Sequence, residues 1–147
     1  MSTLAELEAR EAACRDEIDR LTKRLEDLYE GREDVSVLSR RFQEEMQRRY
    51  RVASSAASLS GLRMGAHYAE MATGLLTHEL GPAGDDALAS LDDQIARQAD
   101  RTEEDLRRAR ALLRGIRADM EQERLRLRRE EAERRAQEAR TQGTSLW

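Results

Sequence analysis

Cysteine, proline and aromatic residues are almost missing from this sequence. Its 147 residues include one Cys and one Pro, and aromatic residues make up only 3%. The single cysteine, Cys14, excludes an intrachain disulfide. So few aromatic side chains cannot fill a thick globular core. Because proline occurs only at Pro82, long helices are permitted almost everywhere else in the chain.

The sequence also lacks a long apolar run and any pattern typical of an enzyme. The first residues contain no apolar stretch preceded by positive charge, so we expect no signal peptide, no membrane insertion and a cytoplasmic location. No phosphate-binding loop follows a strand pattern. His67 and His78 would lie about 16 Å apart along a helix, too far to share a metal. We therefore expect no catalysis, metal or cofactor.

What the sequence has in abundance is charge. Charged residues make up 38% of the chain, against about 25% in an ordinary globular domain, with a net charge of −4. Among the 26 basic residues only Lys23 is lysine, a bias typical of a GC-rich bacterial genome. Between Arg114 and Arg140 the two signs are mixed, which favours a solvated helix. Nucleic-acid binding stays a third hypothesis, and it predicts salt-sensitive affinity.

Two stretches carry apolar residues at alternating spacings of three and four, which is typical of coiled-coil helices. The first seam consists of Leu4, Leu7, Cys14, Ile18, Leu21, Leu25 and Leu28, with a lapse at Glu11, and it resumes with a shifted phase at Val35, Leu38, Phe42 and Met46. The second seam begins with Leu88, Leu91 and Ile95, and continues with a stutter to Leu113, Ile116 and Met120. Ser2 or Thr3, followed by Glu6, predicts a capping box at the first helix.

These patterns predict an all-α fold, a long antiparallel helical hairpin that forms a single elongated domain over residues 1–147. We expect arm one at 3–52, the tip at 53–61, and arm two at 62–140. A kink or short break is expected at 81–84, and a flexible tail at 141–147. A parallel homodimer of the first arm is disfavoured, because Arg10 would face Arg15 of the second copy.

A turn that places Tyr50 beside Leu62 would align the two interruptions of the arms. Gly31 would then fall opposite Gly81–Pro82. In this register arm one ends early, so we expect Leu113, Ile116 and Met120 to lack an intrachain partner and to form a docking surface.

The middle of the chain differs from both arms. The stretch SSAASLSGLRMGAHYAEMATGLL, from Ser54 to Leu76, carries charge only at Arg63 and Glu70. Its many Ala and Gly residues would let two helices approach closely at the tip. The stretch also supplies the other predicted partner-binding residues, which are Leu59, Gly61, Met64, Tyr68, Met71 and Leu75.

A Ser-rich turn, a glycine and a small-residue helix, set between two long arms, form a known arrangement. It resembles the WXG-type helical hairpins of type VII secretion systems, with Leu59-Ser60-Gly61 at the turn and Leu in place of Trp. It resembles still more the YwqH-like accessory proteins of these systems. The Tyr-x-x-x-Asp/Glu secretion signal of the wider family is absent after the second arm.

This resemblance implies a bacterial accessory or chaperone-like protein that binds other proteins. Its partner would be another helical protein or the helical LXG-type targeting domain of a secreted toxin, with which it could be co-exported. The alternative is a self-associating coiled-coil scaffold unrelated to secretion, for which a homodimer is the simplest form.

Overall fold

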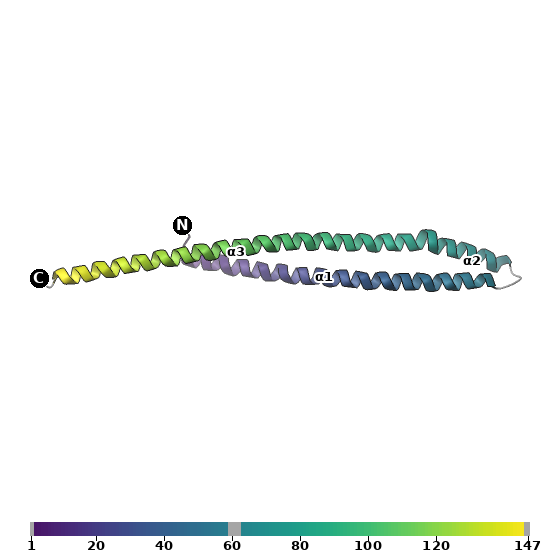
Figure 1. Cartoon of the computed structure of the whole chain (residues 1–147), viewed down its shortest axis with the longest axis horizontal. Coiled ribbons are helices and arrows are strands. Elements are labelled where there is room, and N and C mark those ends of the chain that lie inside the picture. The colour runs from purple at the N-terminus through teal and green to yellow at the C-terminus, as the bar shows by residue number, and fades with distance from the viewer. Residues whose placement is uncertain (1, 59–62, 146–147) are drawn as a thin grey trace. The chain divides into compact units, whose positions relative to one another are not determined.

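The computed structural model describes residues 2–58 and 63–145, and every regular element in this part of the chain is helical (Figure 1). The three α-helices are α1 (Leu4–Ser55), α2 (Arg63–Leu75) and α3 (Gly81–Ser145). A 3₁₀ turn, η1 (Ala56–Ser58), follows α1, and a π-helical turn, η2 (Leu76–Leu80), joins α2 to α3. The predicted all-α fold is confirmed.

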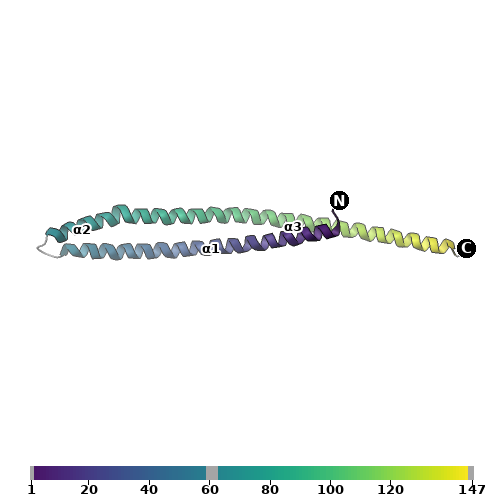
Figure 2. The same ribbon diagram turned by 180° about the vertical axis from the view of Figure 1, so that it is seen from behind.

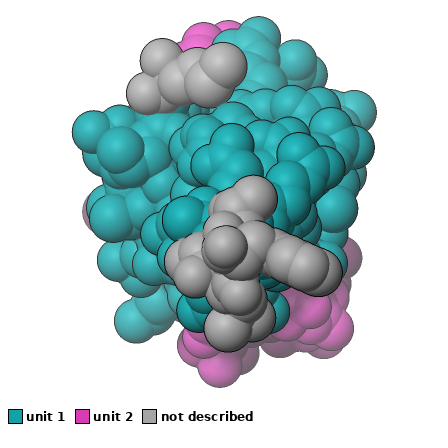
Figure 3. Space-filling model, turned by 90° about the vertical axis from the view of Figure 1, so that its left-hand side faces the viewer, with its two compact units in different colours: residues 1–23, 103–147 teal, residues 24–102 magenta. Residues whose placement is uncertain are grey.

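The chain divides into two compact units, which are coloured separately in Figure 3. Unit 1 comprises residues 1–23 and 103–147, and unit 2 comprises residues 24–102. In each unit a segment of α1 packs against an antiparallel segment of α3. In unit 2, α2 also runs beside the last turns of α1, as the two opposite views agree (Figures 1 and 2). The predicted helical hairpin arrangement holds within each unit.

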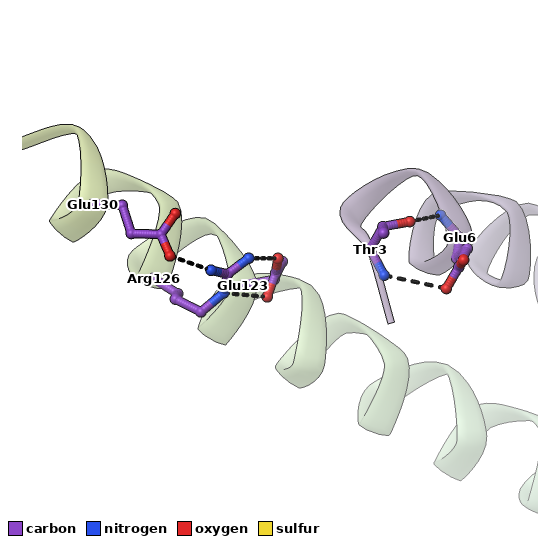
Figure 4. Close-up of polar contacts among 5 residues, drawn as sticks. All are labelled: Thr3, Glu6, Glu123, Arg126 and Glu130. Carbon is purple, nitrogen blue, oxygen red and sulfur yellow. Dashed lines mark hydrogen bonds and ion pairs between the residues drawn. The ribbon is translucent and has the colours of Figure 1, made fainter. Parts of the chain in front are cut away.

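The start of α1 is fixed by the predicted capping box, in which Thr3 is the cap. The Glu6 backbone N–H donates to Thr3 Oγ1, and the Thr3 N–H donates to Glu6 Oε2, each over 3.2 Å (Figure 4). Two amide donors that have no partner inside the helix are satisfied in this way.

The core of unit 1 joins the first turns of α1 to the middle of α3. Its buried members are Leu7, Cys14, Ile116 and Met120, and the half-buried Leu4, Ile18 and Leu113 pack against them. The Cys14 thiol also donates to the Ala109 carbonyl oxygen over 3.2 Å. The expectation that Leu113, Ile116 and Met120 lack an intrachain partner is therefore wrong, because α1 supplies that partner.

In unit 2 the seam between α1 and α3 also contains an ion pair, which the search for apolar residues did not reveal. Arg32 on α1 donates to both carboxylate oxygens of Asp92 on α3, at 3.1 and 3.3 Å. Asp92 occupies the position in the seam that we had predicted for Leu91, which is 42% exposed. With Asp92 counted as a seam residue, spacings of three and four continue without a stutter from Leu88 to Met120.

The relative register of the helices in unit 2 differs from the predicted one by about four helical turns. Gly31 lies against Ile95, whose Cδ1 would be 3.8 Å from an added Cβ, and not opposite Gly81–Pro82. Gly84 lies against the ring of Phe42. The cause is the length of the first helix, which continues to Ser55 and then into η1. Moving the turn by one residue shifts the register by two.

The interruption in arm two exists, but it lies just before the predicted interval. Residues 81–84 are α-helical, and the irregular turn is η2 at Leu76–Leu80. Pro82 has no N–H and its ring would collide with the carbonyl four residues earlier. The wider turn resolves this conflict, and the Gly81 N–H donates to the Leu76 carbonyl oxygen instead. That oxygen would be 2.7 Å from a Cβ at position 81, so the turn requires glycine there.

The ends of the predicted segments also shift. Residues 53–55, assigned to the tip, belong to α1, and α2 begins at Arg63. The predicted tail from residue 141 is helical up to Ser145. Leu59 and Gly61 lie outside the described residues.

Candidate protein-docking surface

The face of α2 that meets α1 is made of small side chains. Ala69 is buried, and Gly65 and Ala72 are half-buried. On α1 the facing residue is the buried Ala53. Small residues allow the two backbones to approach closely, so this contact uses up little of the apolar surface of α2.

The large apolar side chains of α2 are left on an outer face. Their exposed fractions are 83% for Met64, 60% for Tyr68, 62% for Met71 and 46% for Leu75. Successive members are four, three and four residues apart, so they form one stripe along the helix. We call these four residues the α2 stripe. A helix that is apolar on nearly all sides is normally buried. The exposed side chains of this stripe are therefore candidates for contact with another molecule.

A groove between α1 and α2 extends the stripe sideways. It encloses about 430 Å³ and receives Tyr68 and Leu75 from the stripe. Val52 of α1 and Leu80 of η2, which are both exposed, also line it. The stripe and this groove form a continuous apolar surface across two helices.

The α1 rim of this groove carries a net positive charge. Glu45 forms one ion pair with Arg48 at 3.0 Å and another with Arg49 at 3.1 Å. One carboxylate thus stands against two guanidinium groups, all of which line the groove. An acidic side chain at the edge of a bound partner would be attracted to this rim.

A second groove of about 560 Å³ lies on the other side of Leu76, which lines both. Its walls are Met46 and Tyr50 of α1 and Pro82 of α3, with Arg51 and Asp85 beside them. It offers fewer exposed apolar side chains than the first groove.

The predicted site residues thus separate into three groups. Met64, Tyr68, Met71 and Leu75 come together on one exposed face, as a docking surface requires. Leu113, Ile116 and Met120 belong to the core of unit 1 and are not available for docking. Leu59 and Gly61 fall in the part of the chain that the structure does not describe.

Sequence reasoning missed the contribution of α1 to the surface. Arg48, Arg49 and Val52 were assigned only to the end of the first arm, which was predicted at 3–52. A better estimate of the turn would have placed them beside Tyr68 and Leu75, since the register follows from the turn position.

Outside the docking surface, Arg32–Asp92 and Arg117–Glu11 join α1 to α3, and several other ion pairs lie within one helix. A hydrogen bond from Arg126 lowers the pKa of Glu123, and Glu130 binds the same guanidinium from the next turn (Figure 4). Glu131 and Arg135 form an ion pair at 2.8 Å. A hydrogen bond from Arg20 likewise lowers the pKa of Glu17. These contacts stabilise the exposed helices and create no reactive group.

Nothing in the described residues resembles a metal centre: no three His, Cys, Asp or Glu side chains are grouped to hold an ion. Across residues 2–58 and 63–145, no helix has an apolar stretch sufficient to span a bilayer. Comparison with protein-family models, with curated proteins and with solved structures finds no match to this chain.

Proposed function

We propose that this protein is a non-catalytic helical binding protein, an accessory or chaperone-like partner of a type VII secretion substrate. In this role it binds the helical LXG-type targeting domain of a toxin in the cytoplasm and could leave the cell with it. The observation that carries the proposal is the α2 stripe, whose large apolar side chains are 46–83% exposed. The resemblance to WXG-type and YwqH-like hairpins supports the secretion context.

The surface suits a helix as its ligand. An amphipathic helix laid along the groove would place its apolar side chains against Tyr68, Leu75 and Val52, and so complete a third helix beside α1 and α2. Since Arg48 and Arg49 outnumber Glu45 at the rim, the best ligand carries Asp or Glu along the edge that faces α1.

The test is co-expression of this chain with the helical LXG-type N-terminal domain of a secreted toxin, followed by affinity capture and light scattering. We expect a stable complex that Tyr68→Asp or Leu75→Asp weakens at least tenfold, because a charge would be buried against the apolar surface of the groove. Reversing the charge at Arg48 and Arg49 should also weaken it and flatten its salt dependence.

Leu127→Asp is the matched control. Leu127 is an exposed apolar residue of α3, 40% accessible, and it lies outside the proposed surface. A complex that forms equally well with all these variants, or no complex with any such domain, would overturn the proposal. Self-association as a scaffold is the second candidate, and the symmetry of the α2 stripe favours it.

A further inference from the structure

The α2 stripe is complementary to itself. Its residues Met64, Tyr68, Met71 and Leu75 are spaced by four, three and four positions, and this order of spacings is the same in both directions. A second copy of α2 laid antiparallel, with a two-fold axis between positions 68 and 71, therefore places stripe on stripe. Met64 of each copy meets Leu75 of the other, and Tyr68 meets Met71.

We propose that two copies of this chain associate through their α2 stripes in this antiparallel, two-fold arrangement. The inference needs no secretion partner and concerns the chain alone. It goes beyond the proposed function, because it names a second copy as an occupant of the same surface.

The chemistry of the paired side chains favours this contact. Tyr68 would lie against the thioether of Met71 twice, and sulfur–aromatic contacts of this kind are attractive. Methionine adapts its shape to a partner, so the match does not depend on fine complementarity. No Asp, Glu, Lys or Arg belongs to the stripe.

The side-chain pairs differ between the two orientations. In a parallel pair each stripe residue would meet its own copy, so that Tyr68 packs against Tyr68 and Met71 against Met71. In the antiparallel pair Tyr68 meets Met71 twice. Because only the antiparallel pair forms these sulfur–aromatic contacts, the two-fold antiparallel contact is preferred.

The apolar area that the two copies can bury limits the affinity of the dimer. Complete burial of all eight side chains would remove about 1,000 Å² from water, which is below the roughly 1,200–2,000 Å² of a stable interface and in the range of weak, transient ones. We therefore expect a reversible dimer with a Kd on the order of 10–100 µM. A dimer of this strength leaves the surface open to a tighter-binding partner.

Sedimentation velocity of the full chain between about 1 µM and 1 mM tests the association, with circular dichroism recorded on each variant to confirm that the helices are intact. The sedimentation coefficient should rise with concentration, and Met71→Asp should weaken the dimer by at least about tenfold. Leu127→Asp, at an apolar residue of α3 that is 40% exposed and lies outside the stripe, should leave it unchanged. A chain that stays monomeric throughout, or a dimer that Met71→Asp does not affect, overturns the proposal.

Disulfide trapping tests the orientation. Met64→Cys and Leu75→Cys chains, mixed and mildly oxidised, should link to each other several-fold faster than either links to itself. Cys14 can stay in place because it is buried. Faster linking of Met64→Cys to itself would indicate a parallel pair and would refute the antiparallel arrangement. Because no toxin domain is present in these experiments, their failure is separate from failure of the proposed function.

Discussion

The π-helical turn η2 makes a sharp prediction about two glycines of unit 2. Gly81 has ordinary right-handed helical angles, φ −61° and ψ −58°, so its backbone conformation does not itself require glycine. Alanine at such a position normally stabilises a helix by about 1 kcal/mol. At Gly81, however, an added Cβ would lie 2.7 Å from the Leu76 carbonyl oxygen, which already accepts the Gly81 N–H.

The magnitude follows from what must move. A carbon and a carbonyl oxygen normally stay about 3.3 Å or more apart, so the turn must open by roughly half an ångström. Overpacking of this kind costs about 1–3 kcal/mol, and weakening the hydrogen bond adds a further fraction of about 1 kcal/mol. After the helical gain of alanine is subtracted, Gly81→Ala should destabilise unit 2 by about 1–2 kcal/mol.

Gly74→Ala is the matched control, since an added Cβ there meets nothing within 4 Å. It should stabilise the chain by about 0.5–1 kcal/mol. Urea unfolding followed by circular dichroism measures both variants, with the midpoint compared at constant slope. If Gly81→Ala stabilised the chain as much as Gly74→Ala, the turn would not hold the Leu76 oxygen against residue 81, and the argument would fail.

Three further outcomes test the rest of the structure. Ile116→Ala should cost about 2–5 kcal/mol in urea unfolding, whereas Leu112→Ala should change stability by less than about 0.5 kcal/mol, because Ile116 is 3% exposed and Leu112 is 54% exposed; equal effects would contradict the assigned core. Arg126 lowers the pKa of Glu123 in the folded state, so the contribution of this ion pair to stability is complete above the unfolded pKa, near 4.3, and is lost as the pH falls through the lower folded pKa. The difference in Tm between the native chain and Glu123→Gln should therefore shrink between pH 5 and about 2. A constant difference would refute the assignment. Cys14, buried in unit 1, should react with a thiol reagent many-fold more slowly in the native chain than in urea, and equal rates would show that the seam around it opens freely.

How far the sequence predicts this structure depends on how local each feature is. The helices, the capping box at Thr3 and the seam from Leu4 to Leu28 follow from spacing within a few turns, and all are found. The alignment of α1 with α3 does not follow from local spacing, because it depends on the position of a distant turn that no local pattern fixes. That single error displaced Ile116 from the core and removed Val52 from the docking surface.

The ion pair between Arg32 and Asp92 was missed for a different reason. A search for apolar residues at alternating spacings selects Leu91 and skips Asp92, although the carboxylate of Asp92 binds Arg32 across the seam. A pair of opposite charges can hold a seam position when each satisfies the other, and it also penalises every register that separates them. The Arg32–Asp92 pair, whose side chains stay partly exposed, therefore adds a modest preference for the observed register.

The two uses proposed for the α2 stripe compete, and the competition can be measured. A helix bound in the groove would contact Tyr68 and Leu75, the same side chains that the second copy covers. At concentrations well above the Kd of the dimer, the apparent affinity for a partner helix must fall in proportion to the free monomer. We expect Met64→Asp, at the edge of the stripe and outside the groove, to weaken the dimer more than it weakens the complex. If Met64→Asp abolished both equally, the stripe alone, and not the groove beside α1, would carry all recognition.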